Sequence, residues 1–287
     1  MDMALSINEL SCSRCGKCVR VCPSVILYQS SPGEKVELQN VTGCISCGHC
    51  VAVCPTDSVV HSDFPPEKVH QIDREELPTP EQVMLLCESR RSNRAFSSKP
   101  VPENMLEQIL RAAHLAPTAS NKQQVEYTVV TDPVKLQHIS AYTIDIFSSI
   151  ARRLENPVLK FILKPLLPEL YGYIPAFNRL TSEFKTGNDL ILRKATAVIF
   201  IHTPKKSRFG CQDANLAYQN GSLMAESLGV SQFYTGFVCS AIQQDKDNRL
   251  AKSLNIEGTI HAGMALGLPS FKFPKYIDRK EIKVNYL

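Results

Sequence analysis

The chain has 287 residues, of which 44% are hydrophobic and 21% charged, and its formal net charge at pH 7 is +4. This length suits one small and one medium domain of ordinary globular composition. So small a charge implies no general attraction to nucleic acid or membranes. Residues 1–10 lack the apolar core of a signal peptide, and no apolar run approaches the roughly 18 residues of a spanning helix. We therefore expect a cytoplasmic protein without a membrane span.

Two cysteine runs dominate the N-terminal segment. Both have the spacing C-x2-C-x2-C-x3-C followed by proline, and they consist of Cys12, Cys15, Cys18 and Cys22 and then Cys44, Cys47, Cys50 and Cys54. Three closely spaced thiolates hold three corners of a [4Fe–4S] cube, and the last cysteine of each run ligates the other cube. The spacing therefore predicts two clusters with crossed ligands: Cys12, Cys15, Cys18 and Cys54 on one, and Cys44, Cys47, Cys50 and Cys22 on the other.

Two other readings of these cysteines are weaker. Zinc sites also use C-x2-C pairs, but zinc chemistry requires neither the third cysteine nor the proline. A disulfide framework suits a short secreted chain. The segment resembles the bacterial two-cluster ferredoxins over about residues 5–62. That resemblance implies an electron-transfer domain at 1–62. Eight cysteines held as thiolate ligands indicate a reducing, anaerobic cytoplasm.

The rest of the chain predicts a linker and then a second domain. Residues 63–80 are rich in proline and charge and indicate the linker. Thr79 and Gln82 form a capping-box pattern that begins a helix, with Cys87 expected in its core face. We further expect helices near 102–113, 212–228 and 241–253, the second ended by Gly229, and strands at 125–131, 196–202 and 259–266.

Residues 140–190 combine apolar, basic and proline residues with weak helical periodicity. We interpret them as a lid or a dimer-contact excursion. A membrane-surface helix is the alternative, but Pro157, Pro165 and Pro168 interrupt any long amphipathic face.

Two segments of the second domain indicate a bound phosphate and a planar ring. The first contains Arg90, Arg91, Ser92 and Arg94, whose guanidinium and hydroxyl groups suit phosphate. Alone, such a segment is more often a solvated basic face. It is followed one helix later by APTASNKQ at 116–123, where small residues and amides suit backbone lying against a ring with polar edges.

Together these segments resemble the nitroreductase flavoprotein family. The matching stretches are RRSNRAFSSKPV at 90–101, APTASNKQ at 116–123, ESLGV at 226–230, and LGLP with the later Lys275 and Arg279. The resemblance implies an α+β chain, in which the ferredoxin-like domain precedes a sheet flanked by helices over 81–287. It also implies FMN bound at a homodimer interface.

The resemblance further implies which residues hold the flavin. The phosphate and ribityl group would contact Arg90, Arg91, Ser92, Asn93, Arg94, Lys275 and Arg279. The ring would contact Pro117, Thr118, Ala119, Ser120, Asn121 and Gln123, with Thr235 and Gly236 near its N5 edge. No Ser/His/Asp set is present, so no catalytic side chain is assigned and the chemistry is expected at the flavin.

These features predict an oxidoreductase that passes electrons from a low-potential donor through the clusters to FMN and on to an organic acceptor. Reduced ferredoxin is the expected donor, because appended clusters serve no purpose if NAD(P)H delivers hydride directly. Nitroaromatics, quinones, enones and halogenated aromatics remain open as acceptors. An NAD(P)H-dependent nitroreductase with accessory clusters and a non-catalytic relay to a partner protein are the alternatives. Nothing in the sequence indicates nucleic-acid binding.

Overall fold

The computed structural model describes residues 5–287, which form two compact units. The first unit extends to Pro78 and also includes Ala119–Lys122; the second consists of Thr79–Thr118 and Gln123–Leu287. The first four residues of the expected 1–62 domain lie outside the described part. Residues 63–78 of the expected linker group with the first unit. The linker itself remains a prediction.

The first unit is built from short elements around the two cysteine runs. Its strands pair antiparallel, β1 with β4 and β2 with β3, so that Leu5 lies opposite His61 and Leu27 opposite Leu38. The elements are β1 (Leu5–Ile7), α1 (Lys17–Val21), β2 (Leu27–Tyr28), β3 (Glu37–Leu38), η1 (Val41–Gly43), α2 (His49–Ala52), β4 (Val59–His61) and η2 (Pro66–Lys68).

Two glycines fix the equivalent turns of the repeat. Gly16 and Gly48 precede α1 and α2 with φ of 67° and 73°, a left-handed conformation that favours glycine. A Cβ on Gly16 would also lie 2.7 Å from Oε1 of Gln29, and one on Gly48 would lie 3.2 Å from the Phe64 ring. Each turn therefore requires glycine before the helix that carries the third cysteine of its run.

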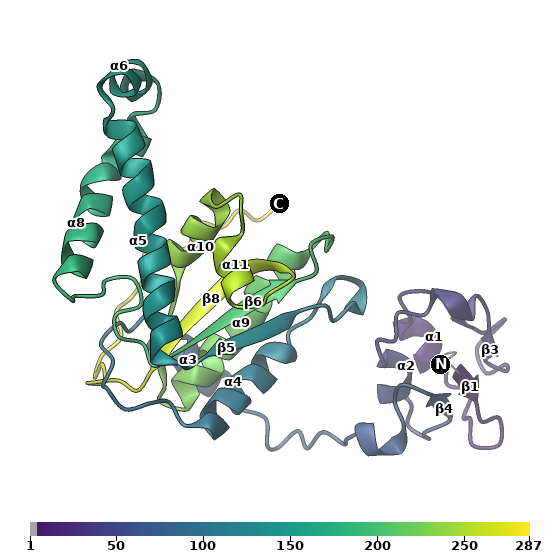
Figure 1. Cartoon of the computed structure of the whole chain (residues 1–287). Helices are drawn as coiled ribbons and strands as arrows, with labels where there is room; N and C mark the ends of the chain where they lie inside the picture. Colours follow the sequence, from purple (N-terminus) through teal and green to yellow (C-terminus); the bar gives the residue numbers. More distant parts are fainter. Residues whose placement is uncertain (1–4) are drawn as a thin grey trace. The chain divides into compact units, whose positions relative to one another are not determined.

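The second unit contains a four-stranded antiparallel sheet in the order β5-β6-β8-β7. Its strands are β5 (Glu126–Val130), β6 (Ala197–Thr203), β7 (Ser231–Tyr234) and β8 (Thr259–Gly267). Helices cover both faces, as Figure 1 shows. They are α3 (Pro80–Ser89), α4 (Glu103–His114), α5 (Pro133–Glu155), α9 (Gly210–Ser227), α10 (Gly236–Gln244) and α11 (Arg249–Ser253), with η3 (Ala119–Asn121) in the intervening chain.

The central strand β6 explains why the sheet must be covered on both sides. All seven of its residues are buried. Successive side chains of a strand point to opposite faces. Val198 and Phe200 join the core beneath α5 and α10, whereas Ala197, Ile199 and Ile201 join the core beneath α4 and α9. The expected sheet flanked by helices is confirmed.

Most sequence-based elements of this unit are confirmed, with two corrections. Thr79 and Gln82 form the predicted reciprocal capping box at the start of α3. Cys87, expected in a core, is exposed. Helix α3 as a whole has no buried residue within the single chain. The helix expected over 241–253 is instead two helices, since the chain leaves the helical conformation after Gln244 and Asn248 adopts a left-handed φ of 51°.

The stretch 140–190 forms a helical arm. It consists of most of the long α5 and then α6 (Pro157–Leu166), α7 (Pro168–Gly172) and α8 (Ile174–Lys185). Helices α5 and α8 pack side by side and extend beyond the sheet, with α6 at their far end (Figure 1). In the part of the chain that the structure describes, every helix is too short or too polar to cross a bilayer. The role of the arm as a lid or dimer contact remains a prediction.

Candidate functional site

The eight cysteines of the two runs surround two separate cavities in the first unit. Each cavity is lined by three cysteines of one run and the last cysteine of the other. The first is lined by Cys12, Cys15, Cys18 and Cys54, and the second by Cys44, Cys47, Cys50 and Cys22. These are the two sets that the spacing predicted for crossed ligation. Leu5, Ile26 and Leu27 also line the second cavity, so its wall is partly apolar.

Backbone hydrogen bonds reach the last sulfur of each run. Ile26 donates its N–H to Sγ of Cys22 at 3.3 Å, and Ser58 donates to Sγ of Cys54 at 3.2 Å. Both donors lie four residues beyond their cysteine, so the bond is part of the repeat. Hydrogen bonds to cluster sulfurs are among the factors that set an iron–sulfur potential.

Burial disfavours the thiolate form of the third cysteine of each run, Cys18 and Cys50, unless a cation is bound beside it. It raises the pKa of the Cys50 thiol to about 11, and it also raises the pKa of Cys18. The outer Cys15 differs, because the Lys17 backbone N–H lowers its pKa. Among residues 5–287 no three His, Cys, Asp or Glu side chains converge on one metal ion. A [4Fe–4S] cube requires no such convergence, since each thiolate binds a different iron.

In the second unit, a cavity of about 500 Å³ is lined by some of the residues predicted to bind the phosphate. Arg91, Asn93 and Lys275 line it together with Phe271 and Phe273. The Arg91 guanidinium carbon lies 5.9 Å from the centre of the Phe273 ring. Arg91 Nε is buried and has no hydrogen-bond partner. An unpaired buried guanidinium donor is costly, and an anion in the cavity would satisfy it.

Asn93 serves the wall of this cavity rather than its interior. It is buried, and its Nδ2 donates to Oγ of Ser231 at 2.8 Å while its Oδ1 accepts from the Ala95 N–H at 3.0 Å. The adjacent Ser92 forms a parallel bridge with Gln232 of β7. Residues 92–93 are thus held against the edge strand of the sheet, which fixes the direction of the arginine segment.

Glu226 is an acidic residue of this cavity that sequence reasoning did not assign. Burial raises the pKa of its carboxyl, although the Arg91 backbone N–H, the Arg90 charge and the Ser89 hydroxyl oppose the shift. Glu226 belongs to the stretch ESLGV, whose resemblance to the family says nothing about this side chain. An acidic residue three positions before a helix-ending glycine gives no local signal of its role.

A second cavity of about 310 Å³ contains the other predicted positions of this unit. Arg94, Thr235 and Gly236 line it with Phe233 and Arg193. Arg94 lies over the Phe233 ring, with its guanidinium carbon 5.4 Å from the ring centre. The predicted residues of the arginine segment therefore divide, with Arg91 in the first cavity and Arg94 in the second.

Thr235 itself is held away from solvent. It is 2% exposed, its N–H donates to the Gly263 carbonyl at 2.8 Å, and its Oγ1 lies 3.8 Å from Sγ of Cys239. A Cβ on Gly263 would clash with Oγ1 of Thr235, so β8 requires glycine at this point. Burial raises the pKa of the Cys239 thiol. Cys239 is thus a protonated core cysteine.

A buried polar chain beside these cavities was missed entirely. Tyr218 donates to Oε1 of Gln232 at 2.6 Å, and Gln232 Nε2 donates to Oγ of Ser222 at 2.8 Å. Tyr234 packs edge-on against Tyr218, with ring centres 4.9 Å apart, and donates to the His261 carbonyl. Burial raises the pKa of both tyrosines, so both remain protonated donors.

The 116–123 segment is placed differently from the arginines. Pro117, Thr118 and Gln123 line neither cavity of the second unit. Residues 119–122 group with the first unit, where Asn121 Nδ2 donates to the carbonyls of Ile45 and Ser46 at 3.2 and 2.8 Å. Arg279 is exposed and lines neither cavity. Within the second unit, therefore, Pro117, Thr118, Gln123 and Arg279 lie outside the two cavities that contain Arg91 and Arg94.

Comparison with known families is consistent with both halves of the chain. Residues 87–268 match the model of the nitroreductase family, and residues 4–55 match that of a 4Fe-4S dicluster domain. The first match spans more than half of the chain, and the chain therefore belongs to the nitroreductase family. The expected class, a nitroreductase-like oxidoreductase with an iron–sulfur domain, is confirmed. No curated protein matched the chain.

Solved structures show the same fold. A nitroreductase with bound FMN from Desulfitobacterium hafniense DCB-2 is 19% identical, with 71% of this chain and 97% of that chain covered and a TM-score of 0.54. One from Bacteroides fragilis NCTC 9343, also with bound FMN, is 19% identical over 71% and 99%, with a TM-score of 0.52. An oxidized iodotyrosine deiodinase bound to FMN and 3-iodo-L-tyrosine is 20% identical over 71% and 98%, with a TM-score of 0.51. At these identities the likeness concerns the fold.

Proposed function

We propose that this protein is an FMN- and iron–sulfur-dependent oxidoreductase that takes electrons from a low-potential donor and delivers them to an organic acceptor. The observation that carries the proposal is the presence, in one chain of the nitroreductase family, of two four-cysteine cavities. A redox fold that received hydride only from a nicotinamide would have no use for two sites of this kind. Reduced ferredoxin is the donor that we propose.

The first unit fits two [4Fe–4S] clusters. Cys12, Cys15, Cys18 and Cys54 would hold one cluster, and Cys44, Cys47, Cys50 and Cys22 the other. Bound clusters supply one-electron transfer at a potential set by charge, burial and hydrogen bonds to sulfur. The N–H groups of Ile26 and Ser58 provide such bonds in this chain. The apolar wall around Cys22 and Cys47 restricts water, which favours a low potential for a site of high negative charge.

The second unit fits the phosphate end of FMN. The buried, unpaired Nε of Arg91 and the ammonium of Lys275 share a cavity large enough for a ligand. Asn93 holds the segment against β7, Arg90 would add positive charge beside the phosphate, and Arg94 with Thr235 and Gly236 would face the remainder of the cofactor from the cavity of about 310 Å³. FMN supplies two-electron chemistry when bound, while these side chains orient it and exclude water. Cations beside the cofactor stabilise its negative charge.

A homodimer would complete this site. Pro117, Thr118 and Gln123 do not reach the cavities of their own chain, although family resemblance assigns that segment to the flavin. Large apolar side chains are exposed on a single chain at Val83, Met84 and Leu85 of α3 and in the segment 269–287. We propose that a second copy covers these surfaces and brings its 116–123 segment to the flavin.

The test is the rate at which reduced ferredoxin bleaches the flavin when one cluster is removed. Cys47→Ala should abolish most of the ferredoxin-driven bleaching, whereas photochemical reduction of the bound FMN should persist. Cys87→Ala is the matched control, because Cys87 is exposed and lines neither cysteine cavity. Unchanged ferredoxin-driven bleaching in Cys47→Ala would contradict the proposal.

Two further outcomes would support the alternatives. Flavin bleaching by NADPH at the turnover rate, equal in wild type and Cys47→Ala, would indicate an NAD(P)H-dependent nitroreductase with accessory clusters. Full cofactor content without turnover of nitroaromatics, quinones, enones or halogenated aromatics would indicate a relay to a partner protein. The same turnover measurements identify which of these classes of compound the protein reduces.

A further inference from the structure

Helix α6, at the far end of the arm, presents its apolar side to solvent. Val158, Phe161 and Leu166 are 67%, 85% and 70% exposed. Only Leu163 joins the small core that Tyr171 forms with α5 and α8. Surface helices of globular proteins turn their apolar stripe inward. Helix α6 does not follow this arrangement, and exposed Ile162 and Leu159 extend the same surface.

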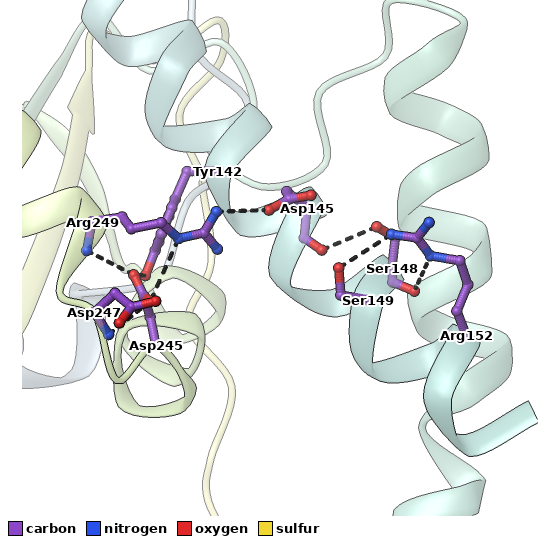
Figure 2. Close-up of polar contacts among 8 residues, drawn as sticks. All are labelled: Tyr142, Asp145, Ser148, Ser149, Arg152, Asp245, Asp247 and Arg249. Carbon is purple, nitrogen blue, oxygen red and sulfur yellow. Dashed lines mark hydrogen bonds and ion pairs between the residues drawn. The ribbon is translucent and has the colours of Figure 1, made fainter.

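The arm that carries α6 is firmly attached at its base. Arg249 pairs with Asp145 of α5 at 3.0 Å and with the buried Asp245 at 3.5 Å, and Tyr142 donates to Asp245 at 3.0 Å (Figure 2). Farther along, the Phe147 and Phe177 rings of α5 and α8 stack with centres 4.5 Å apart. The arm that carries the exposed apolar surface is therefore held at its base and along its two long helices.

The prolines of this region delimit the apolar surface instead of disrupting it. Pro157 occupies the first position of α6 and Pro165 lies in its last turn, while Pro168 begins α7. The Asn156 side chain caps α6 by accepting from the Val158 and Leu159 N–H groups. Between the prolines, one uninterrupted helical face remains, so the objection raised by their positions in the sequence does not apply to α6.

The charge at the tip of the arm is mainly positive. Helix α6 carries Lys160 and Lys164 and no acidic residue. Arg152 and Arg153, at the end of α5, are also exposed. The tip, residues 152–172, has two carboxylates against these four basic side chains: Glu155, which accepts a hydrogen bond from Asn178, and Glu169 in the first turn of α7. The tip thus combines a cationic flank with an apolar face.

We propose that α6 docks the protein on an anionic membrane surface. Phe161, Val158 and Leu166 would enter the boundary between headgroups and acyl chains, and Lys160 and Lys164 would meet lipid phosphates. A second copy is the competing occupant. A two-fold contact between tips would place the four basic side chains of each copy against like charge, whereas anionic lipid complements them. This inference does not rest on the cofactor chemistry proposed above.

The experiment is co-sedimentation of the full, cofactor-loaded protein with lipid vesicles at low salt. Vesicles of phosphatidylcholine alone are compared with vesicles that also contain phosphatidylglycerol. The variants are Phe161→Glu and the pair Lys160→Glu with Lys164→Glu. The control pair is Val134→Ser with Lys135→Glu, which alters an exposed apolar and a basic residue at the opposite end of α5. FMN content, iron content and sedimentation velocity are measured on every sample.

Wild type and the control pair should bind the anionic vesicles and release them as salt is raised. Phe161→Glu should lower the partition coefficient between vesicles and water at least about tenfold. The double lysine variant should lower it about fivefold for each lysine replaced, and the cofactor content of both variants should be unchanged. Absence of wild-type binding, or equal binding of Phe161→Glu, would overturn the proposal. So would salt-independent binding to phosphatidylcholine alone. A change in oligomeric state in Phe161→Glu, without vesicle binding by wild type, would assign α6 to a contact between copies.

Discussion

Replacing the two arginines that face the predicted cofactor should release FMN and leave the iron in place. Arg91 Nε is buried and has no hydrogen-bond partner, so it can donate to a phosphate oxygen without first breaking another hydrogen bond. A hydrogen bond to a charged group contributes about 1.5–3 kcal/mol. Arg94 already donates to the Ser92 carbonyl at 3.3 Å, and we assign it the lower end of that range. Together the arginines contribute about 3–4.5 kcal/mol, which corresponds to a roughly 150- to 2,000-fold weaker affinity in Arg91→Ala with Arg94→Ala.

The assay titrates FMN into flavin-free protein and follows the quenching of its fluorescence, with iron measured on the same samples. Arg111→Ala is the matched control, because Arg111 is exposed on α4 and lines neither cavity. Arg91→Lys should recover part of the affinity, since it restores the charge without the planar pair of donors. An affinity within about twofold of wild type in the double variant would refute the phosphate assignment.

Three other changes test separate parts of the structure. Cys22→Ala should damage the cluster built mainly on the 44–50 run, and loss of the EPR signal of the other cluster instead would contradict crossed ligation. Burial lowers the pKa of His202 in the folded protein. The free energy of unfolding is therefore unaffected by this group above its unfolded-state pKa of about 6.5, and it falls by at most about 1.4 kcal/mol per pH unit as the pH drops below that value. His202→Gln should therefore flatten the fall in Tm between about pH 7 and pH 5, and an unchanged slope would exclude this group as its source. Gly263→Ala should destabilise the protein by about 1–3 kcal/mol in chemical unfolding, because its Cβ would meet a buried threonine hydroxyl, whereas Gly172→Ala, with open space around it, should not.

Local patterns predicted how the cysteines group, the start of α3, and the bounds of α4 and α9 to within two residues. Ligand spacing and capping depend on residues a few positions apart, so Thr79 and Gln82 gave the start of α3 correctly. The break between α10 and α11 could not be predicted in this way. Asp245 accepts from Tyr142, which is 103 positions away, and from the Arg249 N–H, and these bonds hold the turn. Such a tertiary contact leaves no periodic trace in the sequence.

Exposure was the property that the sequence predicted least well. Cys87 occurs at a spacing typical of a core, yet it faces solvent in a single chain, and so do most of the apolar residues of α6. Periodicity reports that a helix has an apolar side and not what covers it. The sequence also did not show that Arg91 and Arg94, three residues apart in one motif, line different cavities.

The central claim is that electrons enter at the cysteine-bound clusters and leave from the flavin. The most direct measurement is an anaerobic reductive titration with reduced ferredoxin, NADH and NADPH, in which flavin absorbance and cluster EPR are followed together. The account predicts that ferredoxin alone reduces the flavin, with cluster signals appearing on the way. Rapid reduction of the flavin by a nicotinamide, with the cluster signals unchanged, would contradict it.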